Sequence, residues 1–203
     1  MKLFQPIALL LVLVLCSTVV LATERQIEID SKVITEHKTE VNGKRFSYSA
    51  TTGTQPVWDE EGNPTATLFY TYYERSDVKD KSKRPLLISF NGGPGSASVW
   101  MHIAYTGPVV LNIDDEGYPI QPYGYKDNGT SILDVADIVY IDPVNTGYSR
   151  TTSKDVPTSR FFGVRADIRY LAEWLNTFVT RNNRWASPKF LAGESYGTTR
   201  AAG

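Results

Sequence analysis

A serine between two glycines near the end of the chain has the residue type and surroundings of a nucleophile. The segment GESYG at 193–197 centres on Ser195, follows the short apolar run 189–192 and precedes small, helix-compatible residues. A serine on a sharp turn from strand to helix presents its Oγ above the sheet, and flanking glycines remove side chains that would clash there. The pattern predicts a nucleophile at Ser195, although a loop serine between two flexible glycines has the same spacing.

A glycine-rich loop about a hundred residues upstream has the character of an oxyanion-binding element. The segment NGGPG at 91–95 directly follows the apolar run 85–90. Acyl transfer needs N–H donors aimed at the oxyanion of the tetrahedral intermediate. Such donors come from the residue after the nucleophile, here Tyr196, and from a glycine-rich loop after an earlier strand. NGGPG alone is also compatible with an ordinary tight turn. The two segments together, each after a predicted buried strand, favour acyl-transfer chemistry.

The elements expected to position these segments alternate between strands and a helix. Residues 44–50 and 65–74 have strand character and are predicted to be antiparallel neighbours. Continuous apolar runs predict buried strands at 85–90, 137–142 and 189–192. Apolar residues at steps of three and four predict a helix over 159–182, with Ser159 as its N-cap. This order predicts an α/β fold with a doubly wound, mostly parallel sheet.

Three ordered motifs resemble the serine carboxypeptidase family. They are FNGGPGSASVW at 90–100, IDPVNTGYS at 141–149 and GESYG at 193–197, so the resemblance extends from about Lys44 to the end. It implies an α/β-hydrolase fold and removal of C-terminal residues from peptides through an acyl-enzyme on Ser195. It places the oxyanion-hole amides on Gly93 and Tyr196, and the groups that hold the substrate's terminal carboxylate on Asn91 and Glu194. We predict a peptide or protein substrate with a free C-terminus, and no cofactor or metal ion.

Three positions depart from the pattern of eukaryotic members. Ser96 and Ser89 stand where those members typically have a cysteine and a tryptophan, and Asn145 stands where a glycine is usual. These departures suggest a bacterial branch of the family. They leave the preferred side chain at the scissile bond open.

The chemistry of Glu194 also supports a role in substrate binding, apart from the resemblance. A carboxyl group beside the nucleophile is able to share a proton with the terminal carboxylate of a substrate. Two such groups at hydrogen-bond distance do not ionise together comfortably, so the acid form is favoured. We therefore expect binding to weaken as Glu194 loses its proton, and activity to favour acidic pH; a solvent-facing role at the turn is the alternative.

A complete catalytic triad is not found in this sequence. In this fold the nucleophile precedes the acid and then the histidine, but none of the eight residues after Ser195 is Asp, Glu or His. His37 lies in a charged segment, and His102 is expected to be a packed or surface residue. The sequence is thus interpreted as the N-terminal portion of an α/β-hydrolase, incomplete at its C-terminus. Expressed alone, it is expected to be inactive and to aggregate through an exposed sheet edge.

The N-terminus predicts export. Residues 1–22 combine Lys2, the apolar stretch 7–15 and a cleavage site near Ala22, which is typical of a signal peptide; an uncleaved anchor is the alternative. Residues 23–43 are interpreted as a leader or peripheral segment and 44–203 as the hydrolase domain. Cys16 is the only cysteine, so a secreted or periplasmic protein of this kind would lack disulfides. A net charge of −1 gives no sign of nucleic acid, and no membrane contact is expected beyond the signal peptide.

Other functions share part of this pattern. A proline-releasing aminopeptidase of the same superfamily resembles His-Gly-Gly-Pro-Gly with a tryptophan after its nucleophile, where this chain has Asn91 and Tyr196. An acyltransferase on the carboxypeptidase scaffold is an alternative because water and an alcohol compete for one acyl-enzyme. A non-catalytic, truncated secreted binding protein is an alternative from a different class.

Overall fold

The computed structural model describes residues 28–203, so the predicted signal peptide and cleavage near Ala22 lie outside the described residues. The strands are β1 (Ser31–Val41), β2 (Lys44–Trp58), β3 (Pro64–Arg75), β4 (Leu86–Phe90), β5 (Val109–Leu111), β6 (Tyr125–Asp127), β7 (Asp137–Ile141), β8 (Arg150–Thr151) and β9 (Lys189–Gly193). The helices are α1 (Val164–Arg181) and α2 (Gly197–Ala202), with short helices η1 (Lys81–Lys83), η2 (Trp100–Thr106), η3 (Ile132–Asp134) and η4 (Thr158–Phe161).

The main sheet has the strand order β1-β2-β3-β7-β4-β9, with β8 beside β3. Strands β7, β4 and β9 are parallel, whereas β1, β2 and β3 pair in antiparallel fashion and β3 is antiparallel to β7. The predicted antiparallel pairing of 44–50 with 65–74 is confirmed, for example by Tyr48 opposite Arg75. The α/β class is confirmed as well. The parallel strands end together at the edge where an α/β sheet holds its ligands.

Residues 31–41 differ from the expected peripheral leader because they form the edge strand β1. This strand pairs with β2 along its whole length, from Ser31 opposite Thr54 to Val41 opposite Lys44. Most of its side chains are exposed. An exposed edge strand needs no hydrophobic period, which is why the polar sequence did not predict it.

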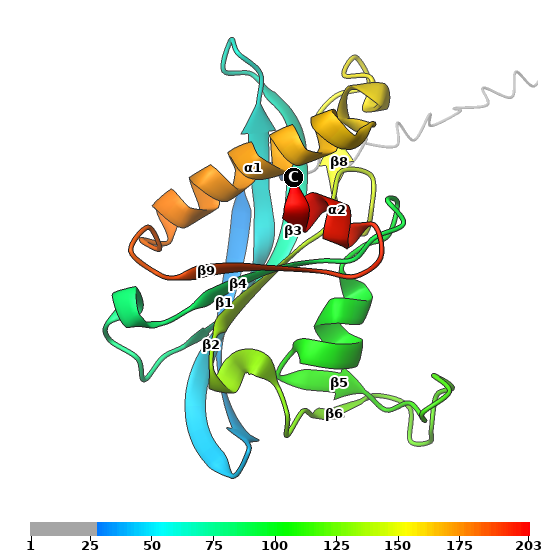
Figure 1. Ribbon diagram of the computed structural model, residues 1–203. Coiled ribbons are helices and arrows are strands. Elements are labelled where there is room, and N and C mark those ends of the chain that lie inside the picture. The colour runs from blue at the N-terminus through cyan, green and yellow to red at the C-terminus, as the bar shows by residue number, and fades with distance from the viewer. Residues whose placement is uncertain (1–27) are drawn as a thin grey trace, which may run out of the picture.

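The predicted strands β4 and β7 are buried on both faces. All five residues of each strand are buried. Leu86 and Ile88 of β4 face one apolar cluster, while Leu87 between them faces the other. Helix α1 lies across the first face (Figure 1) and contributes Trp174 and Phe178 to its core. Continuous apolar runs thus predicted these two strands correctly, because both faces of the sheet are covered.

Helix α1 confirms the predicted period but begins later than expected. Ser159 lies in η4, and α1 starts after Gly163, which has a φ of +94° and provides no side-chain cap. The positive φ turns the chain between the two helices. Phe161 therefore reaches the core from η4 rather than from α1. Within residues 28–203 no helix has the length and apolar character needed to cross a membrane.

Strand β9 is the predicted apolar strand, and it lies at an edge of the sheet among the described residues. It pairs only with β4 among the described residues. Phe190 and Leu191 are 56% and 47% exposed. The exposed hydrophobic sheet edge expected from the sequence is present here.

Candidate active site

Ser195 lies on a strained turn between β9 and α2. Its φ is +56°, a region that residues other than glycine rarely adopt. A Cβ at Gly193 would lie 2.0 Å from the Gly197 carbonyl oxygen, and one at Gly197 would lie 2.7 Å from the Phe90 oxygen. Glycine is therefore required on both sides, as the sequence predicted. Strain of this kind at an exposed serine is typical of functional sites.

The loop of residues 91–95 packs directly against this turn. A Cβ at Gly92 would lie 2.5 Å from the Tyr196 nitrogen and 2.8 Å from the Glu194 carbonyl oxygen. The loop is closed by a hydrogen bond from the Ser96 N–H to the Gly92 oxygen at 3.0 Å. Two segments about a hundred residues apart in sequence thus meet with no room for a side chain between them.

The two N–H groups predicted to bind an oxyanion are free to do so. Within residues 28–203, neither the Gly93 N–H nor the Tyr196 N–H donates a hydrogen bond to the chain. Gly93 has a φ of +109°, which favours glycine there. An open pocket of about 370 Å³ lies over the loop and the turn; it is lined by Gly92, Gly93, Ser96, Trp100, Tyr105, Glu194 and Ser195. The pocket is large enough for a substrate side chain next to the serine.

Asn91 and Glu194, the two residues assigned to the substrate's terminal carboxylate, lie next to each other. The Asn91 side chain is 1% exposed and donates from Nδ2 to Glu194 Oε2 at 3.1 Å. Its Oδ1 accepts a hydrogen bond from the Met101 N–H at 3.0 Å, which fixes the orientation of the amide. Glu194 itself is exposed and lines the pocket. The Asn91 amide and the Glu194 carboxyl group therefore lie side by side, and Glu194 directly precedes Ser195.

Asp142 at the end of β7 anchors the segment after the glycine-rich loop. Its Oδ1 accepts a hydrogen bond from the Ser98 N–H at 2.9 Å, and burial raises the pKa of this carboxyl group. Ser98 Oγ in turn donates to the Ile141 oxygen and accepts from the Asn91 N–H at 3.4 Å. The motif at 141–149 thus positions the loop at 91–98 through hydrogen bonds.

His102 packs against aromatic rings, which is one of the two placements that the sequence left open. Its Nε2 lies 2.7 Å from the Tyr73 hydroxyl, and its ring stacks on Tyr140 at a centroid distance of 4.6 Å. Burial lowers the pKa of His102 to about 4. His37 lies exposed on β1 and stacks on Tyr48. Neither histidine lines the pocket at Ser195.

Sequence reasoning missed several residues at this site. Trp100 and Tyr105 form a wall of the pocket and are 47% and 56% exposed. Arg200, in contrast, is 6% exposed and reaches the glycine-rich loop from α2. The signal for Arg200 was a single charged residue in the small-residue segment TTRAAG. Among residues 28–203, no group of three or more His, Cys, Asp and Glu is placed to hold a metal ion.

Comparisons with known proteins agree with this geometry. A family model described as serine carboxypeptidase matches residues 46–199. The chain is 29% identical to serine carboxypeptidase-like 36 of Arabidopsis thaliana over 139 residues, 66% of this chain and 26% of that protein. It is 32% identical to a pheromone-processing carboxypeptidase of Saccharomyces cerevisiae over 144 residues, 68% of this chain and 18% of that protein. These relatives are from a plant and a yeast, so the bacterial branch stays a prediction.

A comparison with solved structures agrees with the sequence matches. The structure of a prohormone-processing carboxypeptidase from Saccharomyces cerevisiae matches with a TM-score of 0.58 and 24% identity, over 74% of this chain and 31% of that chain. This likeness confirms the α/β-hydrolase fold. The chain spans about a quarter of the length of the curated relatives it matches.

Proposed function

We propose, from the premise that this chain belongs to the serine carboxypeptidase family, that its complete protein removes C-terminal residues from peptides with Ser195 as the nucleophile. The observation that carries the proposal is the hydrogen bond between Asn91 and Glu194 at the pocket of Ser195. A peptidase that needs a free C-terminus must recognise a carboxylate close to the scissile carbonyl. An amide donor and a carboxyl group adjacent to the serine are suited to that task.

Recognition of the terminal carboxylate would use both partners of this pair. The Asn91 amide has two N–H donors, and only one is needed for Glu194. In the proposed complex the other N–H would donate to the substrate carboxylate. Glu194 in its acid form would donate to the same carboxylate and share its proton. The last residue of the substrate would then lie in the pocket beside Trp100 and Tyr105.

The reaction would proceed by acyl transfer. Ser195 Oγ attacks the scissile carbonyl carbon, and the carbonyl oxygen becomes an oxyanion between the N–H groups of Gly93 and Tyr196. The C–N bond breaks, the free amino acid leaves with the serine proton, and an ester on Ser195 remains. Water then attacks the ester and releases the shortened peptide. A base has to move these protons, and we propose that the triad acid and histidine are supplied by sequence after Gly203 in the complete protein.

The test is Ser195-dependent turnover in the full-length gene product. The wild-type protein should react with a fluorophosphonate probe and release the last amino acid from an N-blocked dipeptide. Ser195→Ala should abolish labelling and lower kcat by roughly a millionfold, as for other triad nucleophiles. Labelling that survives in Ser195→Ala would contradict the proposal. Absence of labelling in the wild-type protein would favour the non-catalytic binding protein.

A matched pair of substrates tests the role of Asn91 and Glu194. The same dipeptide with a free C-terminus and with a C-terminal amide differs only in the carboxylate. We expect kcat/KM for the free acid to be highest at acidic pH and to fall as the pH rises, because the shared proton is lost. Glu194→Gln should remove this fall, since an amide keeps its N–H donors at every pH. A kcat/KM for the free acid that rises steadily to alkaline pH would contradict the proposal.

The products separate the alternative enzymes. Release of the last residue identifies a carboxypeptidase, release of an N-terminal proline identifies the aminopeptidase, and an ester product in the presence of an alcohol identifies the acyltransferase.

We also propose export of the protein, with the mature chain starting at Thr23. N-terminal sequencing of the protein from the periplasm or medium tests this start, and a chain retained in the membrane would favour the anchor.

A further inference from the structure

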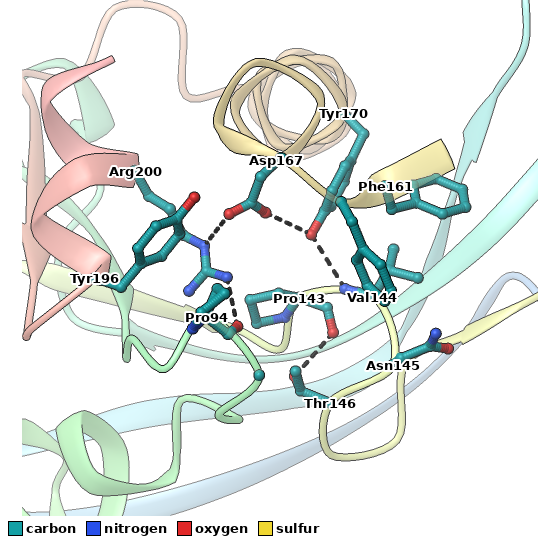
Figure 2. Close-up of a pocket in the computed structure, with 13 residues that line it drawn as sticks. Pro94, Pro143, Val144, Asn145, Thr146, Phe161, Asp167, Tyr170, Tyr196 and Arg200 are labelled. Carbon is teal, nitrogen blue, oxygen red and sulfur yellow. Dashed lines mark hydrogen bonds and ion pairs between the residues drawn. The ribbon is translucent and has the colours of Figure 1, made fainter. Parts of the chain in front are cut away.

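A buried arginine connects the nucleophile helix to the glycine-rich loop. Arg200 lies on α2, five residues after Ser195, and is 6% exposed. Its Nη1 donates to the Asn91 carbonyl oxygen and its Nη2 to the Pro94 carbonyl oxygen, both at 2.7 Å. Figure 2 shows this guanidinium group between Tyr196 and the loop at Pro94. One rigid side chain therefore holds two carbonyl groups of the same loop.

The charge and orientation of Arg200 are fixed from the other side by α1. Asp167 Oδ2 accepts a hydrogen bond from Arg200 Nε at 2.9 Å, and Asp167 is itself 5% exposed. Asp167 Oδ1 accepts from the Tyr170 hydroxyl at 2.8 Å, and the Tyr170 oxygen accepts from the Val144 N–H at 3.2 Å. The dashed lines in Figure 2 follow this chain of contacts. With every nitrogen of the guanidinium group directed by a partner, Arg200 has a single orientation.

The two carbonyl groups flank the peptide that bears a proposed oxyanion donor. Asn91 O belongs to the peptide before Gly92, and Pro94 O to the peptide before Gly95. The Gly93 N–H lies between these two fixed points. Glycine has little intrinsic backbone restraint, so a segment Gly-Gly needs external contacts to hold one orientation. Arg200 supplies contacts on both sides of it.

Arg200 also lies against the residue that carries the second proposed donor. Its guanidinium carbon is 5.1 Å from the centroid of the Tyr196 ring. Because Arg200 and Tyr196 share the same turn and helix, a contact from Arg200 to the loop sets the distance between the Tyr196 and Gly93 N–H groups. We propose that Arg200 is a positioning residue that holds the two oxyanion donors in register. This inference rests on the proposed function, because it assumes that these N–H groups bind an oxyanion.

Two substitutions in the full-length protein test this role. Arg200→Lys keeps the charge and contact with Asp167, but one ammonium group cannot replace the planar fork that spans both carbonyl groups. Arg200→Gln removes the charge as well. We expect both variants to lose roughly 10- to 100-fold in kcat, since small displacements of catalytic groups have effects of this size. KM should change by less than about threefold, because donors used only in the transition state do not alter KM.

A transition-state analogue distinguishes positioning from a general structural role. A peptide boronic acid places an oxygen in the oxyanion site, so its inhibition constant should rise in parallel with the loss in kcat. The free amino acid product does not use that site, and its inhibition constant should not change. Arg184→Lys is the matched control: this arginine is 0% exposed and lies at the other end of the sheet. It should lower the melting temperature while kcat per titrated site stays at the wild-type value.

The outcomes are distinguishable from failure of the proposed function. Wild-type protein without Ser195-dependent turnover would overturn both ideas. Active wild-type protein together with Arg200 variants that lose only melting temperature, with unchanged kcat per titrated site, would overturn the positioning role alone. If Arg200→Gln does not fold, Arg200→Lys carries the test. Failure of both to fold would show that Arg200 acts on the fold rather than on the donors, and would also overturn it.

Discussion

Buried arginines lie at both ends of strand β4, and the two ends use the same chemistry for different purposes. At its amino end Arg184 donates to the Arg84 carbonyl oxygen at 2.9 Å and to Asp137 Oδ2 at 2.6 Å. At its carboxyl end Arg200 donates to the Asn91 carbonyl oxygen and to Asp167. Each arginine combines one buried aspartate with backbone carbonyl groups.

The difference lies in what the contacted backbone does. Arg184 contacts Asp137 at the start of β7 and the Arg84 carbonyl oxygen just before β4, and it also donates to the Tyr72 hydroxyl of β3. Asp137 also accepts from Arg84 Nε at 3.0 Å. This cluster therefore connects the starts of β4 and β7 and should affect stability. The partners of Arg200 are loop carbonyl groups beside the pocket, so its loss should affect geometry at Ser195. The role of a buried ion pair therefore depends on the backbone segment that it holds in place.

The largest expected effect is a loss of stability at the amino end. Asp137→Asn removes the charge that two buried guanidinium groups share, and leaves Arg184 with the more distant Glu74 carboxylate at 3.7 Å. We expect the free energy of unfolding to fall by about 3–5 kcal/mol, as when one partner of a buried pair is removed. Urea denaturation measures this. The rate of fluorophosphonate labelling per folded molecule should not change, and a slower rate would mean that the two ends are not independent.

The next effect is a pH-dependent loss of stability beneath the site. Burial lowers the pKa of His102 to about 4, against about 6.5 in an unfolded chain. The unfolded state therefore binds the proton first as the pH falls. The contribution of neutral His102 to the free energy of unfolding is fully present above pH 6.5. It is lost as the pH falls from about 6.5 to 4, by up to about 3 kcal/mol. His102→Gln should flatten urea-derived stability over that range, whereas His37→Gln on the exposed strand β1 should not. Equal curves for wild type and His102→Gln would contradict the burial argument.

Gly92 offers an activity effect of similar size at the carboxyl end. A Cβ at Gly92 meets the Tyr196 nitrogen at 2.5 Å, whereas a Cβ at Gly95 in the same loop meets no atom within 4 Å. Gly92→Ala should push the loop away from the turn and lower kcat about 100-fold, or about 2.7 kcal/mol in activation free energy. Gly95→Ala is the control and should keep wild-type kcat. Equal activity of the two variants in the peptide assay would show that the close packing does not set the donor geometry.

The parts of this molecule that the sequence predicted are those governed by local rules. The turn at Ser195 was predictable because only glycine fits beside it, and β4 and β7 were predictable because strands covered on both faces are apolar throughout. The family resemblance assigned Asn91 and Glu194 to the same group of the substrate, and the structure brings these residues to hydrogen-bond distance.

The parts that were not predicted depend on long-range contacts. Strand β1 is polar because it is an exposed edge, so it had no hydrophobic period to detect. Asp167 and Arg200 lie 33 residues apart, and nothing local to either residue indicates the other. Their pairing became visible only when α1 and α2 were placed side by side on the sheet.

A third arginine gives the smallest expected effect and sharpens the contrast. Arg181 at the end of α1 contacts both oxygens of Asp30, at 2.9 and 2.8 Å, in a geometry as favourable as that of either buried pair. Its side chain and that of Asp30 are 42% and 48% exposed, so water competes for every contact. A double-mutant cycle of Arg181→Gln and Asp30→Asn, measured by urea denaturation, should give a coupling energy below about 1 kcal/mol. This coupling should shrink further as salt is added, because exposed charges are screened. A coupling of several kcal/mol would mean that distance, rather than burial and the identity of the contacted backbone, decides the strength of these arginine pairs.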